Sequence, residues 1–85
     1  MLIKAKVLIK GTGAKPWKDK TYHTVEVYGI EGAPADCKVD VDYEKQRPLY
    51  DLAGKNVAKI VDMAMDVTFW NGQARFNLVG FDVPK

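Results

Sequence analysis

The sequence predicts an all-β fold, a small five-stranded OB-like barrel with a protruding β-hairpin arm. Several short runs alternate apolar and polar residues with the period of two that is typical of strands. Turn-forming residues separate these runs, and few of the 85 residues show helical periodicity. Five strands in so short a chain favour a barrel, because closure removes the exposed strand edges. An SH3-like barrel is the alternative form.

The length and charge of the chain predict one domain, residues 1–85, with one basic face. Hydrophobic residues make up 47% and charged residues 28% of the chain, as in folded soluble domains. The net charge is only +2, but residues 1–20 carry six lysines and one acid, a net charge of +5, and the remainder carries −3. This asymmetry indicates a basic face on a nearly neutral body. The alternative is an ordinary strand with solvated lysines.

The first half of the chain predicts three strands. The first is expected over residues 2–10, and residues 11–22, GTGAKPWKDKTY, form the expected hairpin arm. The second strand covers residues 22–30, a loop with Gly and Pro covers 31–36, and a short strand covers 37–42. The side chains expected to face the core are Ile3, Ala5, Val7, Ile9, His23, Val25, Val27, Cys37, Val39 and Val41.

The second half predicts a final hairpin. Residues 43–54 are the least regular part, with room for a turn of helix around residues 49–53. From Val57 to Phe69 a strand and a helix compete, and the strand is favoured because its alternation runs into Asn71-Gly72, the strongest short hairpin signal. The return strand is expected over residues 73–83, with a bulge at Gly80. The expected inward residues are Val57, Val61, Met63, Met65, Val67, Phe69, Ala74, Phe76, Leu78, Val79, Phe81 and Val83.

The residue types needed for catalysis are scarce, and we expect that the protein is not an enzyme. The single histidine, His23, lies in a strand-like run, where a structural role is the more common one. Asp40 and Asp42 are two apart on an exposed strand face without a third oxygen ligand, so no metal site is expected. Gly11-Thr12-Gly13 is not followed by the Lys-Ser/Thr of a phosphate loop, and the chain contains no serine. No cofactor is therefore expected.

The sequence predicts a cytoplasmic protein, located in the host cytoplasm if the source is viral. The one cysteine, Cys37, excludes an intrachain disulfide and is expected to be a small apolar strand residue. Lysines at positions 4 and 6 interrupt the apolar run at the start, so no signal peptide is expected. No apolar run has the length of a membrane span, and no membrane association is expected.

The arm is the candidate binding element. It places Trp17 among lysines, where nothing nearby in the sequence would bury a large aromatic ring. Lysines that contact phosphates and aromatic rings that stack on bases are the means by which proteins bind single-stranded nucleic acid. The arm residues assigned to this task are Lys15, Trp17, Lys18, Lys20 and Tyr22.

Four short motifs resemble the single-stranded DNA-binding proteins of filamentous bacteriophages, the gene V protein type. They are the opening Met1-Leu2-Ile3-Lys4, the Lys20-Thr21-Tyr22 that starts the second strand, the stretch from Glu44 to Gly54, and the terminal Val83-Pro84-Lys85. The similarity extends loosely over nearly the whole chain. Two features depart from the family pattern: the arm has no arginine, and Trp17 has no matching family position.

The resemblance implies an OB-type barrel that forms a two-fold homodimer and coats single-stranded DNA cooperatively during DNA replication. It adds Tyr28 as a second stacking residue, Phe69 or Trp70 as the aromatic of the last hairpin, Arg75 as a phosphate contact, and two basic loop residues. The nucleic-acid-binding residues are thus expected to be Lys15, Trp17, Lys18, Lys20, Tyr22, Tyr28, Lys45, Arg47, Trp70 and Arg75.

Three alternatives to this function stay open. An SH3-like protein-interaction module would use the same aromatic residues, with Asp40 and Asp42, to hold a proline-rich peptide. A structural assembly subunit would exchange the arm between protomers. RNA is as compatible as DNA, because nothing in the sequence reads a 2′-hydroxyl. Tyr22 and Tyr28 could also pack on the outside of the barrel or in a dimer seam, and Trp70 could cap the core.

Overall fold

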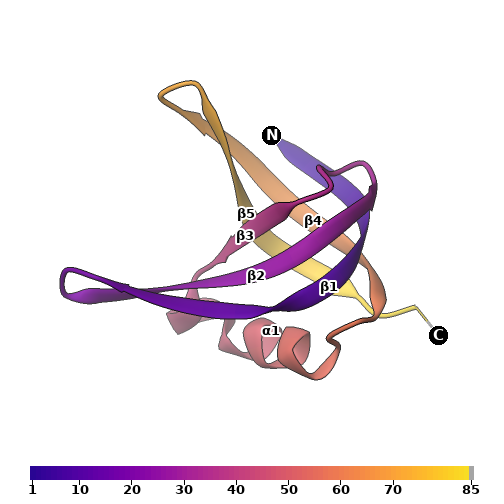
Figure 1. Cartoon of the computed structure of the whole chain (residues 1–85), viewed down its shortest axis with the longest axis horizontal. Coiled ribbons are helices and arrows are strands. Elements are labelled where there is room, and N and C mark those ends of the chain that lie inside the picture. The colour runs from indigo at the N-terminus through magenta and orange to yellow at the C-terminus, as the bar shows by residue number, and fades with distance from the viewer. Residues whose placement is uncertain (85) are drawn as a thin grey trace.

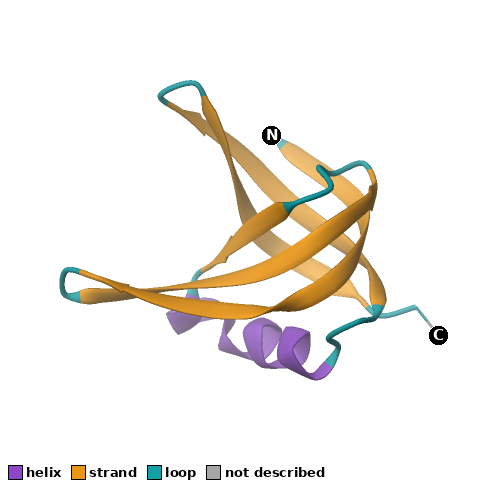
Figure 2. Cartoon of the chain, viewed as in Figure 1, coloured by secondary structure: helices purple, strands orange, loops and turns teal. Residues whose placement is uncertain are grey.

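The computed structural model describes residues 1–84 as a closed five-stranded barrel (Figures 1 and 2), which confirms the predicted small all-β barrel. Lys85 of the terminal motif lies outside the described residues. Around the barrel the strand order is β1-β2-β3-β5-β4, antiparallel everywhere except between β3 and β5. The elements are β1 (Leu2–Trp17), β2 (Lys20–Glu31), β3 (Cys37–Val41), α1 (Tyr43–Lys55), β4 (Ile60–Trp70) and β5 (Gln73–Asp82).

The core follows the predicted alternation in the first three strands and in most of β4. Alternate side chains point into the barrel because the strand period is two. Except for the half-buried Ile3 and His23, the predicted inward side chains of β1, β2 and β3 are almost fully buried, and Cys37 is among them. The buried apolar residues are Ala5, Val7, Ile9, Val25, Val27, Cys37, Val39, Val41, Ala53, Val61, Met63, Met65, Val67 and Leu78.

Two hairpins extend beyond the barrel. Pairing between β1 and β2 continues to Trp17 opposite Lys20, so β1 is longer than the predicted strand over 2–10 and the arm is a regular hairpin. The second hairpin joins β4 to β5 through the predicted turn at Asn71 and Gly72, both with positive φ (50° and 76°), which a type I′ hairpin turn requires. Figure 1 shows both hairpins projecting at the left of the barrel, with β3 between them.

Residues 43–54, predicted as the least regular part with a turn of helix around 49–53, form a longer helix, α1, which lies beneath the barrel (Figure 2). The Asp42 side chain caps the helix by accepting a hydrogen bond from the Lys45 amide at 3.4 Å. The sequence pattern did not indicate a full helix here because Pro48 lies inside it, and proline is unfavourable in a helix interior. The helix is irregular at Gln46 (φ −119°, ψ 24°). Of the residues the structure describes, none belongs to a helix with the length and apolarity needed to cross a membrane.

The last hairpin differs from the prediction in where β4 begins and in which of its side chains face the core. The strand interpretation of β4 is confirmed, but β4 begins at Ile60 and not at Val57, since Ala58 adopts a positive φ of 69° in the preceding turn. Phe69 is 70% exposed because it lies beyond the end of the barrel. The bulge at Gly80 is confirmed by the register shift beside Ala64, yet Val79 is exposed there. Ala74 and Val83, also expected to face inward, are exposed as well.

Candidate functional site

A groove runs across the outside of the barrel between the two hairpins. It consists of three hollows of about 600, 430 and 310 Å³, and Arg75 lines all three. We call it the outer groove. Its walls come from the arm, β3 and the β4–β5 hairpin, and the first turn of α1 closes one end. The polar, charged and aromatic residues that line it are Lys15, Trp17, Tyr22, Thr24, Lys38, Asp40, Asp42, Lys45, Gln46, Thr68, Trp70, Gln73, Arg75, Phe76 and Asn77.

Strand alternation and register bring these residues together. Where inward residues fill the core, the residues between them must point outward. Thr24 on β2 lies opposite Asp40 on β3, and Asp40 lies opposite Asn77 on β5. Lys15 is paired with Tyr22. The groove therefore follows a row of cross-strand neighbours over β2, β3 and β5, and the Lys15–Tyr22 pair lies beside this row on the arm.

Three aromatic rings on the groove are unusually exposed. Trp17 and Tyr22 on the arm are 59% and 48% exposed, and Trp70 at the end of β4 is 69% exposed. Rings of this size normally bury most of their surface in a folded domain. Their exposure along one groove, on two separate hairpins, provides flat apolar faces for a ligand.

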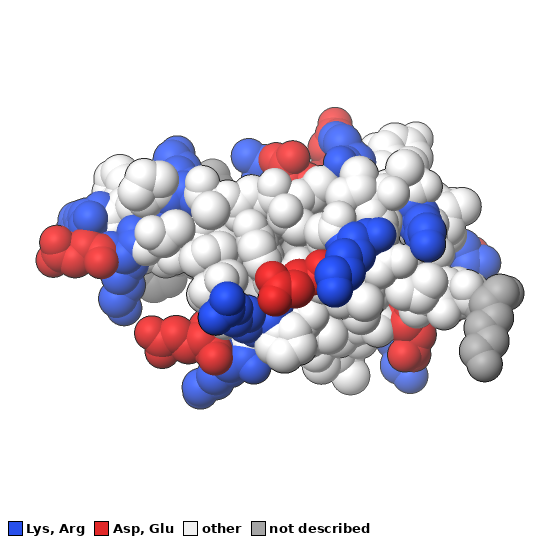
Figure 3. Space-filling model, turned by 90° about the horizontal axis from the view of Figure 1, so that it is seen from below, with Lys and Arg blue, Asp and Glu red and all other residues white. Residues whose placement is uncertain are grey.

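The charged residues of the groove are mainly basic, and two of its four cations are ion-paired among residues 1–84: Lys38 with Glu26, and Arg75 with Asp40. Lys15 and Lys45 make no ion pair within 4.0 Å with any residue in the range 1–84, and neither do Lys18 and Lys20 near the arm's tip. Arg75 is different, because its guanidinium lies 3.1 Å from an Asp40 carboxylate oxygen. Figure 3 shows basic side chains gathered at the left end, where the arm lies. These exposed cations can bind a polyanion at little desolvation cost.

The outer groove brings together six of the ten binding residues predicted from sequence: Lys15, Trp17, Tyr22, Lys45, Trp70 and Arg75. Lys18 and Lys20 lie next to it, at the turn of the arm.

Tyr28 and Arg47 lie outside the groove. Tyr28 lies at the other end of β2, opposite Leu8. Arg47 lies on α1, 4.0 Å from Asp51 and 5.7 Å from the centre of the Tyr43 ring.

Sequence reasoning missed most of the floor of the groove, where it had named only Asp40, as part of the peptide-binding alternative. Lys38, Asp40 and Asn77 face it, together with Thr24 and Thr68. The alternation over residues 37–42 places Lys38 and Asp40 outward. No short-range signal indicates that the parallel pairing of β3 with β5 sets Asp40 beside Asn77.

His23 belongs to an aromatic cluster at the base of the arm. Its ring stacks on Tyr43 with 3.9 Å between centroids and contacts the edge of Tyr50 at 5.1 Å. The Tyr50 hydroxyl donates a hydrogen bond to the Gly13 carbonyl at 3.4 Å. This cluster holds α1 against the start of the arm, and the role of His23 is therefore to position these two elements. Residues 1–84 contain no cluster of three metal-ligating side chains.

No family model, no curated protein and no solved structure matches the chain. The resemblance to the filamentous-phage proteins therefore rests on the four sequence motifs alone. Function has to be inferred from the outer groove.

Proposed function

We propose that the protein binds single-stranded DNA in the outer groove, with little dependence on sequence, and coats the strand. One observation carries the proposal: three exposed aromatic rings and the unpaired cations Lys15 and Lys45 line a single groove. Stacking on rings suits every base, and lysines suit every phosphate. RNA is the alternative nucleic acid.

The topology supports an OB-like interpretation of the barrel. Five strands close in the order β1-β2-β3-β5-β4, and α1 lies between β3 and β4. OB-folds bind oligonucleotides on the face of strands 2 and 3 and with the loops that join strands 1–2 and 4–5. The outer groove is built from the same three parts: the arm, the outer face around β3, and the β4–β5 hairpin.

In this proposal the strand crosses the barrel from one hairpin to the other. Bases stack on Trp17 and Tyr22 at one side and on Trp70 at the other, and each stacked base contributes about 1–3 kcal/mol. Lys15 and Lys45 neutralise phosphates, and each such contact adds roughly 0.7 to the slope of log affinity against log salt. A two-fold dimer and cooperative coating, implied by the phage resemblance, belong to the same proposal.

The experiment is a titration of tryptophan fluorescence with oligo-dT at two salt concentrations. We expect saturable quenching that weakens steeply with salt. Tyr22→Ala should weaken binding about fivefold or more, from the loss of one stacked base. Tyr28→Ala is the matched control, because Tyr28 lies on the same strand with the same exposure, 47% against 48%, but outside the groove. Absence of quenching by oligo-dT at low salt would overturn the proposal.

A peptide-binding module is the second candidate, and one observation favours it. Asp40 and Asp42 line the same hollow as Tyr22, which is the combination that the SH3-like alternative requires. Titration with a proline-rich peptide distinguishes the two functions. Peptide binding would depend weakly on salt and would be lost in Tyr22→Ala, whereas binding of the polyanion depends steeply on salt.

A further inference from the structure

A carboxylate occupies the middle of a groove that otherwise suits phosphates. Asp40 projects from β3 into the largest hollow, with its side chain 32% exposed. Its Oδ2 accepts a hydrogen bond from Arg75 at 3.1 Å, and Oδ1 has no hydrogen-bond donor among residues 1–84. A phosphate at this point would be repelled by the Asp40 carboxylate, and one Arg75 N–H group is already bonded to that carboxylate. The floor of the groove is therefore suited to hydrogen-bond donors.

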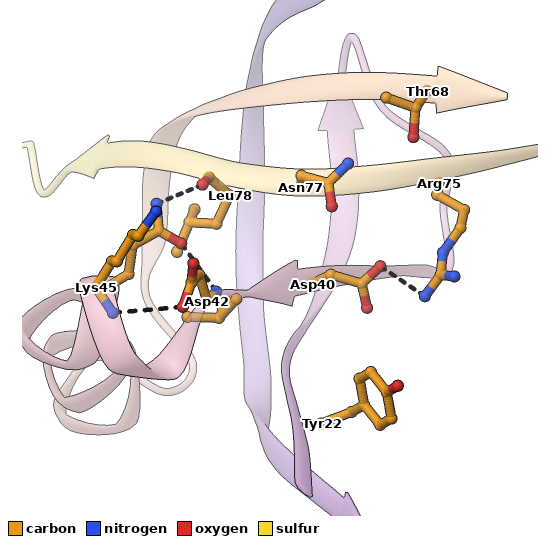
Figure 4. Close-up of a pocket in the computed structure, with 10 residues that line it drawn as sticks. Tyr22, Asp40, Asp42, Lys45, Thr68, Arg75, Asn77 and Leu78 are labelled. Carbon is orange, nitrogen blue, oxygen red and sulfur yellow. Dashed lines mark hydrogen bonds and ion pairs between the residues drawn. The ribbon is translucent and has the colours of Figure 1, made fainter. Parts of the chain in front are cut away.

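Asn77 adds a second acceptor beside it. The two residues are direct neighbours in the β3–β5 pairing. The Asn77 Nδ2 donates to the Asp66 carbonyl at 3.3 Å, which leaves its Oδ1 free. In Figure 4 the Asn77 oxygen points from β5 toward Asp40, and the Tyr22 ring lies across the hollow. Two acceptors thus face one space that has an aromatic wall.

The neighbouring charge makes this space suitable for a neutral ligand. Arg75 balances the charge of Asp40, so no cation is needed to fill the hollow. Its volume of about 600 Å³ lies within the ~300–1,000 Å³ typical of sites for small organic groups. A single nucleobase is neutral and small enough for this volume, and its flat ring can stack on Tyr22.

We propose that the hollow between Tyr22, Asp40 and Asn77 is a base-reading site that prefers guanine. The Watson–Crick edge of guanine presents two adjacent donors, N1–H and N2–H2, to the two acceptors. Adenine and cytosine present one amino group beside an acceptor nitrogen, and thymine presents one N–H between two carbonyl oxygens that the carboxylate repels. Splayed single-stranded bases are commonly read on this edge, and carboxylates accept hydrogen bonds from base amino groups. This inference rests on the proposed binding of single strands.

The test compares three oligomers of equal length: all-dT, dT with one central dG, and dT with one central deoxyinosine, which lacks the N2 amino group. The wild-type protein should bind the dG oligomer at least about fivefold more tightly than all-dT, the lower end of what a bidentate base contact discriminates. The affinity for the deoxyinosine oligomer should lie between the affinities for the other two, because this base keeps the N1–H donor but lacks the N2 amino group. Asp40→Asn should abolish the dG preference while binding of all-dT is kept or strengthened, because Arg75 is released.

Glu26→Gln is the matched control. Glu26 is an outward carboxylate on β2, paired with Lys38 at 3.9 Å and outside the hollow, so the dG preference should persist in this variant. Equal affinity of the wild-type protein for the three oligomers would overturn the base-reading site and leave the proposed function intact. An equal loss of affinity for all three in Asp40→Asn would also overturn it, because Asp40 would then only position Arg75. Failure of every oligomer to bind would overturn the proposed function itself.

Discussion

The side chain of Gln46 supports the shortest strand pairing of the barrel, the one between β3 and β5. Strands β3 and β5 pair through only two residue pairs, Val39 with Phe76 and Asp40 with Asn77. Beyond them, Gln46 links β5 to Asp42, the residue that follows β3: its Nε2 donates to the Leu78 carbonyl at 2.6 Å, and its Oε1 accepts from the Asp42 amide at 3.1 Å. The irregular backbone at Gln46 directs the side chain into this gap. We therefore expect Gln46→Leu to weaken the closure of the barrel between β3 and β5 and to lower the free energy of unfolding.

The cost of Gln46→Leu follows from the two lost hydrogen bonds. A typical hydrogen bond contributes about 0.5–1.5 kcal/mol net, so two contribute about 2 kcal/mol. The half-buried position of Gln46 lets water recover part of the lost hydrogen bonding, while leucine recovers some hydrophobic burial. The free energy of unfolding should therefore fall by about 1–2 kcal/mol.

Urea unfolding followed by far-UV circular dichroism measures this loss. Gln73→Leu is the control, because Gln73 lies exposed on the β4–β5 hairpin and should change stability by less than about 0.5 kcal/mol. Gln46→Glu tests the geometry further. A carboxylate keeps the acceptor for the Asp42 amide but cannot donate to Leu78, so it should destabilise as well. A Gln46→Leu protein as stable as the Gln73→Leu control would refute the bridging role.

Three further predictions concern the core and its turns. Met65→Ala should lower the free energy of unfolding by about 2–5 kcal/mol, because Met65 is fully buried; a loss below 1 kcal/mol would contradict the assigned core. Gly29→Ala should cost about 1–3 kcal/mol, since a Cβ there would clash with the Ala33 and Pro34 carbonyls, while Gly11→Ala, with open space around the added carbon, should not. Burial, and secondarily the Asp40 charge, raise the pKa of the Cys37 thiol. The folded protein should therefore react with a disulfide reagent at pH 8 far more slowly than the denatured chain, and its reaction should become faster as the pH rises. Equal reaction rates of the folded and denatured protein would contradict the burial of Cys37.

Short-range sequence patterns predicted most of the barrel, because apolar and polar residues alternate regularly along most of its strands. Alternation fixed which side chains of β1, β2 and β3 face the core, and Asn71-Gly72 located the final turn. Only a turn of α1, around residues 49–53, could be predicted, because Pro48 interrupts the helical pattern. Phe69 was assigned inward because periodicity continues along a strand past the point where the barrel ends.

The candidate site was predictable only in part, since it depends on pairing between distant strands. The exposed aromatic residues of the arm could be recognised from composition. The pairing of β3 with β5 joins segments more than 30 residues apart, and it alone brings Asp40 to Asn77 and Arg75. Tyr22, assigned from its place in the arm, lines the groove, whereas Tyr28, added by the family resemblance, does not.

The central claim is that single-stranded DNA occupies the outer groove, and mapping of backbone amide NMR shifts during titration with oligo-dT tests it most directly. The largest shifts should fall on Trp17, Tyr22, Lys38 and Arg75, which line the groove from four separate strands. The amide of Tyr28 should stay nearly unchanged. Shifts concentrated on α1 or around Tyr28, with the groove unaffected, would contradict the claim.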